Sequence, residues 1–184
     1  MTSMNKYLAA ALTFVIFNSC VVEKPLANQK SIKKPLIEPV NFQEEFLKKI
    51  NKLRTEGCNC GNTYMPPVEP IVWNYQLQLS ALGHAQDMAR NGYFSHVSKN
   101  GYKFKERITA AGYTPKGYQS FNIGENIAWG QSSIKEVMKG WLNSPSHCKN
   151  LMNPAFKEVG IALEKTYWVQ DFGGRVPFGR RNSK

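Results

Sequence analysis

Hydrophobic residues recur every three to four positions in three stretches of the chain, at 42–53, 77–88 and 134–141. This is the period of an amphipathic helix that turns one face toward a core. A shorter stretch, from Phe104 to Ala111, has the same character. The pattern therefore predicts three amphipathic helices and a fourth, short one.

The residues that flank these stretches are typical of helix ends. Asn41, Asn74 and Ser133 suit the N-cap position, and a glutamate three residues after the first and the third of them completes a capping box. Gly92 stands where the second helix would end in the left-handed conformation, and Pro145 ends the last one. We expect the helices to begin and end close to these residues.

A period of two residues replaces the helical period near the C-terminus. Apolar and polar residues alternate over 159–163 and 167–172, which predicts a β-hairpin that turns at 164–166. The glycine and prolines of 58–70 predict an irregular loop, and the stretch from Gly173 predicts a flexible end. Helices followed by strands, without strict βαβ alternation, predict an α+β domain.

The first twenty residues indicate the compartment. Lys6 precedes an apolar run, 7–17, that is too short to span a bilayer and suits the core of a signal peptide. The run ends at "FNSC", which resembles a bacterial lipoprotein signal in which the cysteine, here Cys20, is lipidated. We predict a signal peptide over 1–19 and an extracytoplasmic, membrane-anchored lipoprotein. The alternative is ordinary cleavage and secretion, with Cys20 left as a thiol.

The net charge of +11 is high for 184 residues. Residues 20–40 are rich in lysine and proline and lack any period, so we predict a flexible tether that brings basic side chains close to anionic headgroups. The scattered basic residues, the lack of a nucleic-acid motif and the export signal argue against nucleic acid as a partner. Solubility alone is the simpler explanation of the charge.

Glu125 lies in the largely apolar stretch "NIGENIAWG", where a charge must be paired, hydrogen-bonded or metal-bound. The chain has three histidines. His84 belongs to an apolar stripe and is predicted to be a core residue satisfied by a hydrogen bond. His96 and His147 lie in small, loop-like contexts, where imidazoles are more often functional.

Five stretches around these residues resemble, in the same order, a bacterial member of the CAP superfamily, also called SCP or cysteine-rich secretory protein domains. They read HAQDMARNGYFSH, ITAAGY, GENIAWG, GWLNSPSHCKNLMNPAFKEVGIAL and YWVQDFG. The resemblance implies a CAP domain over 41–174, followed by a basic tail over 175–184. It also implies a three-layer α-β-α sandwich with a central antiparallel sheet, and a secreted or surface location.

The resemblance further implies a ligand cleft. In animal CAP domains two histidines and two acidic residues line a cleft for which divalent metal binding has been proposed, and the matching positions here are His96, Glu125 and His147. Ser144 stands where the second acid would be, and Asn126 follows the glutamate in the same motif. Two imidazoles and a carboxylate suit zinc with one position open for water. Alternatively, Glu125 accepts hydrogen bonds from backbone N–H groups and the histidines and pins loops across the cleft.

Cysteine chemistry adds one element. With Cys20 lipidated, three cysteines remain in an oxidising compartment, so one disulfide is expected between Cys148 and either Cys58 or Cys60. The resemblance to bacterial relatives implies Cys60 as the partner. A redox or nucleophilic cysteine is the less favoured interpretation, although Cys148 is adjacent to His147.

Three functions fit these residues. The first, which we expect, is a monomeric binding module that takes a lipid, glycan or peptide in the cleft or in a groove beside the sheet. The second is a metal-dependent hydrolase with Glu125 as general base or ligand, weakened by the missing second acid. The third is a module whose basic surface docks on anionic envelope polymers. Aromatic residues expected to line an apolar groove, unless they pack in the core, are Tyr93, Phe94, Tyr113, Tyr118, Phe121 and Trp129.

Overall fold

The computed structural model describes residues 39–179, over which the chain forms five helices and six strands. The helices are α1 (Pro39–Glu56), α2 (Tyr75–Asn91), α3 (Phe104–Ala110), α4 (Ile134–Asn143) and α5 (Pro145–Leu151). The strands are β1 (Cys58–Cys60), β2 (Thr63–Met65), β3 (Val72–Trp73), β4 (Ser120–Trp129), β5 (Glu158–Glu164) and β6 (Tyr167–Val176). The predicted signal peptide, Cys20, most of the tether and the last five residues of the tail lie outside the described residues.

Four of the strands form one mixed sheet in the order β3-β5-β6-β4. β5 and β6 form the predicted hairpin, and β4 pairs antiparallel with β6 along its whole length. The prediction of a purely antiparallel sheet is wrong at one edge, because β3 pairs parallel with β5. A long connection with several helices separates these two strands in sequence, and such a connection permits parallel pairing where a short turn does not.

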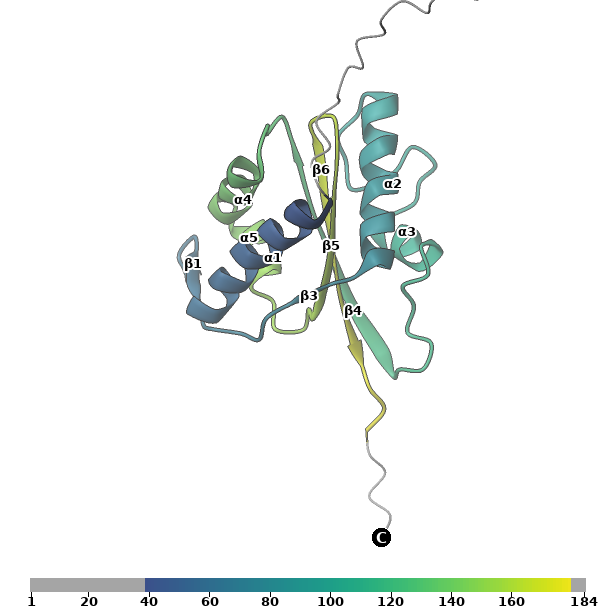
Figure 1. Ribbon diagram of the computed structural model, residues 1–184. Helices are drawn as coiled ribbons and strands as arrows, with labels where there is room; N and C mark the ends of the chain where they lie inside the picture. Colours follow the sequence, from purple (N-terminus) through teal and green to yellow (C-terminus); the bar gives the residue numbers. More distant parts are fainter. Residues whose placement is uncertain (1–38, 180–184) are drawn as a thin grey trace, which may run out of the picture. The chain divides into compact units, whose positions relative to one another are not determined.

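The helices cover both faces of this sheet, as the α-β-α prediction required. Figure 1 shows α2 and α3 on one face and α1, α4 and α5 on the other. The α+β fold, with helices packed on a central sheet, is therefore confirmed. Among the helices of residues 39–179, none combines the length and the apolar composition that crossing a bilayer would require.

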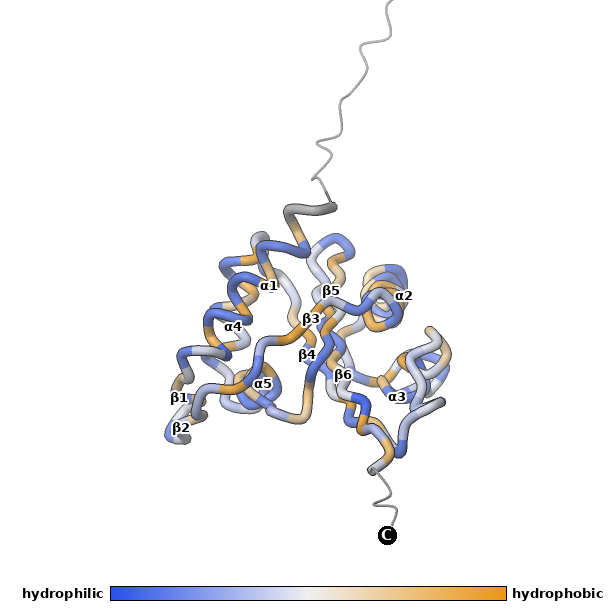
Figure 2. The backbone as a smooth tube through the Cα atoms, turned by 60° about the horizontal axis from the view of Figure 1, so that its bottom comes forward, coloured by the Kyte–Doolittle hydropathy of each residue, from blue (hydrophilic) through white to orange (hydrophobic). Residues whose placement is uncertain are grey.

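Apolar side chains from both helical layers meet the sheet. The larger cluster lies between the sheet and α1, α4 and α5, and the tube in Figure 2 shows hydrophobic segments along the central strands. Its largest members are Phe46, Trp141, Phe156, Trp168 and Phe172. A smaller cluster under α2 consists mainly of alanine, valine and methionine. The periodic stretches found in the sequence thus supply the core-facing sides of the helices.

Most of the predicted helix ends are confirmed. The Asn74 side chain accepts hydrogen bonds from two backbone N–H groups at the start of α2, and Gly92 ends this helix in the left-handed conformation. Ser133 caps α4 by accepting from the N–H of Glu136. The prediction at Asn41 is wrong, because α1 already begins at Pro39, a residue type well tolerated in the first helical turn.

Two elements contradict the sequence-based predictions. The segment predicted as an irregular loop contains a short hairpin of β1 and β2, whose turn is made by Gly61 in the left-handed conformation. Pro145 not only ends α4 but begins α5, because proline suits the first turn of a helix. His147 therefore lies on a helix and not in a loop.

The predicted flexible end is also ordered further than expected, because β6 continues to Val176. A Cβ atom on Gly173 would lie 2.4 Å from the Tyr113 ring, and one on Gly174 would lie 1.8 Å from the carbonyl oxygen of Ala155. These glycines are thus required for close packing and do not mark a flexible tail. Arg175, predicted to open the tail, forms an ion pair with Glu158 from within the strand.

A buried arginine fastens α1 to the segment that follows α5. The guanidinium of Arg54 donates to the carbonyl oxygens of Glu69, Leu151 and Phe156 at 2.7–3.0 Å. Burial lowers the pKa of Arg54, and carbonyl acceptors take the place of a carboxylate partner. The contacts hold α1 against the end of α5 and the segment that follows it.

Candidate functional site

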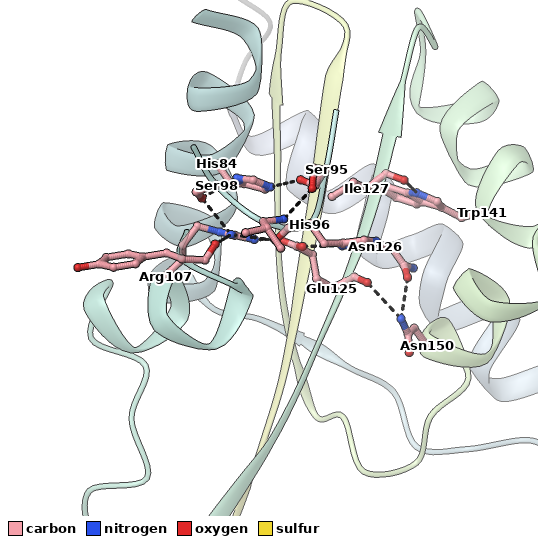
Figure 3. A network of polar contacts seen from close by, with 12 residues as sticks. His84, Ser95, His96, Ser98, Arg107, Glu125, Asn126, Ile127, Trp141 and Asn150 are labelled. Carbon is pink, nitrogen blue, oxygen red and sulfur yellow. Dashed lines mark hydrogen bonds and ion pairs between the residues drawn. The ribbon is translucent and has the colours of Figure 1, made fainter. Parts of the chain in front are cut away.

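Glu125 lies at the centre of a buried polar network on β4 (Figure 3). Its side chain is fully buried, Oε1 lies 2.7 Å from Nδ1 of His96, and Oε2 accepts from Nη2 of Arg107 at 2.5 Å. Charge-assisted hydrogen bonds of this kind offset the cost of burying a carboxylate. The network answers why a glutamate stands among apolar neighbours: both of its oxygens are engaged.

Arg107 connects this carboxylate to the segment between α2 and α3. Besides Glu125, it donates through Nη1 to the carbonyl oxygens of His96 and Tyr102 and to the hydroxyl of Ser98, at 2.9–3.1 Å. One guanidinium therefore holds the His96 loop against β4. The sequence analysis missed Arg107, because a single arginine in a short helix gives no periodic or motif signal.

Asp171 is the second carboxyl group of the network. It lies directly opposite Glu125 in the pairing of β6 with β4, and it is fully buried. Neither of its oxygens has a hydrogen-bond partner among the described residues. Burial, reinforced by the nearby charge of Glu125, raises the pKa of Asp171 well above its usual value. We therefore expect a neutral carboxylic acid at this position. It lies within the stretch "YWVQDFG", where no sequence pattern distinguishes it from its neighbours.

His84 is the core histidine that its apolar stripe predicts. It is completely buried on α2, and its Nε2 lies 2.8 Å from the carbonyl oxygen of Ser95, so this nitrogen carries the proton and donates. Nδ1 lies 3.3 Å from the hydroxyl of Ser98. Burial lowers the pKa of His84, which keeps the imidazole neutral. The prediction of a satisfied structural histidine is confirmed.

His96 and His147 approach β4 from different sides of the sheet edge. The His96 side chain is about half exposed and comes from the loop after α2, whereas His147 comes from α5. Burial, followed by the charge of His96, lowers the pKa of His147, so the two imidazoles are within electrostatic reach of each other. β4 is the last strand of the sheet, and its outer edge lies between these helical layers.

Asn126 anchors the α5 side of this edge. Its Nδ2 donates to the carbonyl oxygen of His147 at 3.2 Å and to Gln170 at 3.0 Å, and Asn150 donates to its Oδ1 at 2.8 Å. Asn150 also reaches the carbonyl oxygen of Glu125 (Figure 3). Asn126 is thus a buried positioning residue rather than an exposed ligand.

The remaining predicted cleft residue, Ser144, takes no part in the network. It is partly exposed between α4 and α5, and its hydroxyl lies 3.3 Å from that of Ser146. Within residues 39–179, the one group of three potential metal ligands whose donor atoms lie within 4.8 Å of one another consists of cysteines. Within that part of the chain, His96, Glu125 and His147 do not form such a group, so the three-ligand zinc site of the sequence prediction is not assembled. Glu125 fits as the carboxylate that orients His96, because both of its oxygens already have partners.

The predicted disulfide is present. Cys60 and Cys148 are bonded, with their Cα atoms 5.4 Å apart, and the bond joins β1 to α5 across 88 residues. Cys58 keeps a free thiol. Because Cys148 follows His147 directly, the disulfide fixes the backbone at this histidine.

An apolar groove lies elsewhere, between α1 and α4. It has a volume of about 470 Å³, and Leu53, Met138 and Leu142 contribute its apolar surface. Four lysines and one glutamate also line it: Lys49, Lys52, Lys135, Lys139 and Glu56. The aromatic residues predicted to line a groove do not lie here. Tyr113 is fully buried in the core, and Trp129 stacks on Tyr167 at the far end of β4.

A second cavity, of about 440 Å³, lies between α2, the His96 loop and α3. Its walls include His84, Ser98 and Arg107 from the polar network. Leu79, Ala110 and Ala111 add apolar surface to this cavity, so its walls are mixed. The groove between α1 and α4 differs in that four lysines surround its apolar surface.

Sequence comparisons agree with this architecture. The family model described as the cysteine-rich secretory protein family, CAP, matches residues 47–172. The chain is 36% identical over 103 residues to the uncharacterized membrane protein YlbC of Bacillus subtilis, and 34% identical over 110 residues to the uncharacterized protein YkwD of the same organism. These matches cover 55% and 59% of this chain but 28% and 41% of the relatives, so the chain spans less than half of either one.

Solved structures show the same fold. An extracellular protein containing an SCP domain from Bacillus anthracis has a TM-score of 0.60 at 29% identity, over 72% of this chain and 40% of that one. An outer surface protein from Borrelia burgdorferi has a TM-score of 0.57 at 26% identity, over 74% of this chain and 94% of that one. Both similar proteins are extracellular or located at the outer surface.

Proposed function

This chain belongs to the cysteine-rich secretory protein family, CAP, and from that premise we propose that it is an extracytoplasmic protein that binds an anionic amphiphile between α1 and α4. The ligand has one acyl chain and an acidic head group. This moves the predicted ligand from the histidine cleft to a groove in which apolar and cationic side chains line the same cavity.

One observation carries the proposal: apolar and cationic side chains meet in the same groove. Leu53, Met138 and Leu142 give a surface on which an acyl chain is removed from water. Lys49 and Lys52 form ion pairs with glutamates one helical turn away, whereas Lys135 and Lys139 have no such partner within the described part of the chain. These two cations on α4 are placed to receive the acidic head.

The location is supported by three observations. The Cys60–Cys148 disulfide suits an oxidising compartment, and the similar structures come from extracellular or outer-surface proteins. The sequence of 1–20 has the features of a lipoprotein signal, so we propose that Cys20 anchors the chain to a membrane. A groove for single-chain amphiphiles suits a protein held close to a lipid surface.

Titration of the full mature chain with the fluorescent fatty acid cis-parinaric acid tests the groove. We expect saturable binding that weakens about tenfold in Lys135→Glu/Lys139→Glu, because reversal of two charges repels the carboxylate. The matched control Lys105→Glu/Lys116→Glu changes the net charge equally but lies outside the groove, and it should bind like the wild type.

Two further comparisons complete this test. The methyl ester of the same acid should bind the wild type more weakly than the acid does, and it should not distinguish the two double variants. Binding that disappears entirely at high salt would favour docking of anionic polymers on the basic surface, since apolar contacts survive screening. Equal loss of affinity in both double variants would overturn the assignment to this groove.

Divalent metal binding at His96 and His147 is a second candidate. The observation that favours it is the 2.7 Å contact between Glu125 and Nδ1 of His96, since a carboxylate behind an imidazole orients the other ring nitrogen for a metal. When bound, zinc would act as a Lewis acid toward water or a ligand. The protein's own residues would hold the imidazoles: Glu125 and Arg107 on one side, Asn126 on the other.

Calorimetry with zinc tests this candidate. Wild-type protein should bind zinc at pH 7.5 and lose affinity at pH 5.5, because imidazole coordinates only when neutral. His96→Ala/His147→Ala should abolish binding and leave the fold intact, whereas His84→Ala should destabilise the core and spare the metal. Equal zinc affinity of wild type and double variant would leave Glu125 with its loop-pinning role alone.

A further inference from the structure

The sulfur atoms of three cysteines lie together between β1 and α5. Side chains two residues apart on a strand point to the same face, so Cys58 and Cys60 of β1 both point toward α5. Cys148 of α5 faces both of them. Cys148 therefore has two cysteine neighbours because β1 is a strand, in a hairpin that the sequence did not predict.

The free thiol is in contact with the disulfide. The Sγ atom of Cys58 lies 3.7 Å from that of Cys148 and 3.9 Å from that of Cys60. These are van der Waals distances, and they are nearly equal. Cys60 and Cys148 are completely buried, whereas Cys58 is partly exposed. The disulfide is thus shielded from solvent but lies within reach of a thiol of the same chain.

The surroundings of the three sulfurs are apolar. Met152 is buried with them, and Leu53, Met65, Val68 and Leu142 pack around them. Apolar surroundings destabilise the thiolate, and burial therefore raises the pKa of Cys58. The three sulfurs also satisfy the spacing of a metal site, but two of them are joined in a disulfide and lack the thiolate form that a metal requires. Sulfur exchange therefore fits the oxidised protein better than metal binding does.

We propose that Cys58, Cys60 and Cys148 form an intramolecular thiol–disulfide exchange centre, in which Cys148 alternates between the two cysteines of β1. The nearly equal distances place the thiol beside the S–S bond, so rotation of the Cys58 side chain must first bring its Sγ into line with that bond. The Cys58 thiolate then attacks Sγ of Cys148, a Cys58–Cys148 bond forms, and the Cys60–Cys148 bond breaks with its electron pair on Cys60. The proton lost by Cys58 is balanced by one gained at Cys60. One disulfide and one thiol are present before and after, so no external oxidant or reductant takes part.

Exchange changes which thiol meets the solvent. With Cys148 bonded to Cys60, the free thiol is the partly exposed Cys58, where an external disulfide or electrophile has access. With Cys148 bonded to Cys58, the free thiol is the buried Cys60. The centre thus has a reactive and a protected isomer. This inference does not depend on the proposed amphiphile groove.

Disulfide mapping of single variants of the full chain tests whether both bonds can form. Cys60→Ser should fold with a Cys58–Cys148 disulfide, and Cys58→Ser should keep the Cys60–Cys148 disulfide, both with thermal midpoints close to the wild type. Cys58→Ser/Cys60→Ser is the matched control that leaves Cys148 without a partner. A folded Cys60→Ser protein in which Cys148 is recovered as a free thiol would overturn the proposal.

Exchange in the wild type is followed by incubation at different pH, quenching in acid, alkylation of the unfolded chain and peptide mapping. Alkylated Cys60 should appear beside alkylated Cys58, and its rate of appearance should rise about tenfold per pH unit below the pKa of the thiol, since the thiolate is the nucleophile. In Cys58→Ser no alkylated Cys60 should appear at any pH. Free thiol confined to Cys58 after prolonged incubation at pH 8.5 would show a fixed disulfide and contradict the proposal.

Discussion

The helical layer of α1, α4 and α5 packs on the sheet through one large cluster of aromatic and aliphatic side chains. The layer of α2 and α3 has a smaller apolar cluster at Leu77, Ile108 and Tyr113, and elsewhere it packs through small side chains and a polar network. On the first face, Phe46, Trp141 and Trp168 form an aromatic cluster. On the second, Ala81 and Ala85 lie against the strands beside the buried groups of Glu125 and Asp171.

The difference gives each face its own kind of candidate site. The apolar face leaves a groove between α1 and α4, where the proposed ligand would extend the packing of the apolar core. The polar face positions imidazoles and carboxyl groups, and most of its donors and acceptors are fixed by one another. We expect substitutions that reduce side-chain volume to lower stability most on the first face. On the second face, we expect stability to depend on close backbone packing and on pH.

Trp141→Ala should have the largest effect. The indole is 1% exposed, packs in the aromatic cluster and donates to the carbonyl oxygen of Ile127. Truncation of a buried tryptophan leaves a cavity and should lower the free energy of unfolding by about 4 kcal/mol. Urea denaturation measures this loss. Leu142→Ala, at the neighbouring and only partly buried position, should cost clearly less. Equal losses at the two positions would contradict a face held together by large buried side chains.

Gly160→Ala should break the opposite face by adding a single methyl group. A Cβ atom at this position in β5 would lie 2.0 Å from the backbone nitrogen of Gln78 in α2. Backbone cannot yield as a side chain does, so we expect a loss of about 3 kcal/mol. Gly140→Ala is the matched control, because a Cβ atom there meets nothing within 4 Å. It should stabilise α4 by about 0.5–1 kcal/mol through helix propensity. A tolerated Gly160→Ala would mean that α2 is not seated on the strands as closely as described.

Asp171→Asn should change how stability depends on pH. Because the folded-state pKa of Asp171 is raised, the folded chain binds more protons than the unfolded chain above the ordinary aspartate value. The contribution of this protonation to stability is fully present below about pH 3.9 and is lost as pH rises through the folded-state pKa. Over that range the free energy of unfolding falls by up to about 1.4 kcal/mol per pH unit. Asparagine does not titrate, so the variant should gain stability relative to the wild type as pH rises.

Urea denaturation at pH 4, 5.5 and 7 measures this trend. Val137→Ala, a buried truncation on the apolar face, is the control, and its destabilisation should be the same at all three values of pH. A constant difference between Asp171→Asn and wild type would show that Asp171 ionises normally in the folded chain. Comparison of the two variants shows whether the pH dependence of stability arises on the polar face.

The two faces also differ in how much of their structure could be predicted from the sequence. The apolar face was predicted well, because Ile134, Val137, Met138 and Trp141 repeat with the helical period and a period is a local signal. The hairpin of β5 and β6 was predicted for the same reason. The resemblance to CAP domains correctly paired Cys60 with Cys148, and the apolar surroundings of Glu125 correctly predicted that its charge has partners.

The polar face was only partly predictable. Arg107 and Asp171 meet Glu125 from α3 and β6, and their convergence depends on tertiary packing that no local pattern records. The glycines at 173 and 174 were mistaken for flexibility, because the sequence shows that a side chain is absent but not which neighbour occupies its space. The C-x-C of β1 was assigned to a loop, since three-residue strands are too short for a periodic signal.

Helix caps were predicted from sequence on both faces, and they give the smallest test of the comparison. Asn74 accepts from the N–H groups of Gln76 and Leu77 at 2.9 and 3.1 Å, and its own Nδ2 donates to Glu158 at 2.8 Å. Ser133 accepts from one N–H group, at 3.2 Å. Loss of a cap costs about 0.5–2 kcal/mol, so Asn74→Ala should fall near the upper limit and Ser133→Ala near the lower. The reason is that Asn74 also joins α2 to the sheet, as the polar face requires, whereas Ser133 serves its own helix alone.

Urea denaturation of both variants and of Asn74→Ser, which restores the cap but not the contact with Glu158, separates the two contributions. If Asn74→Ser recovers full stability, the contact with the sheet contributes nothing, and the polar face is held by its buried network and close backbone packing alone.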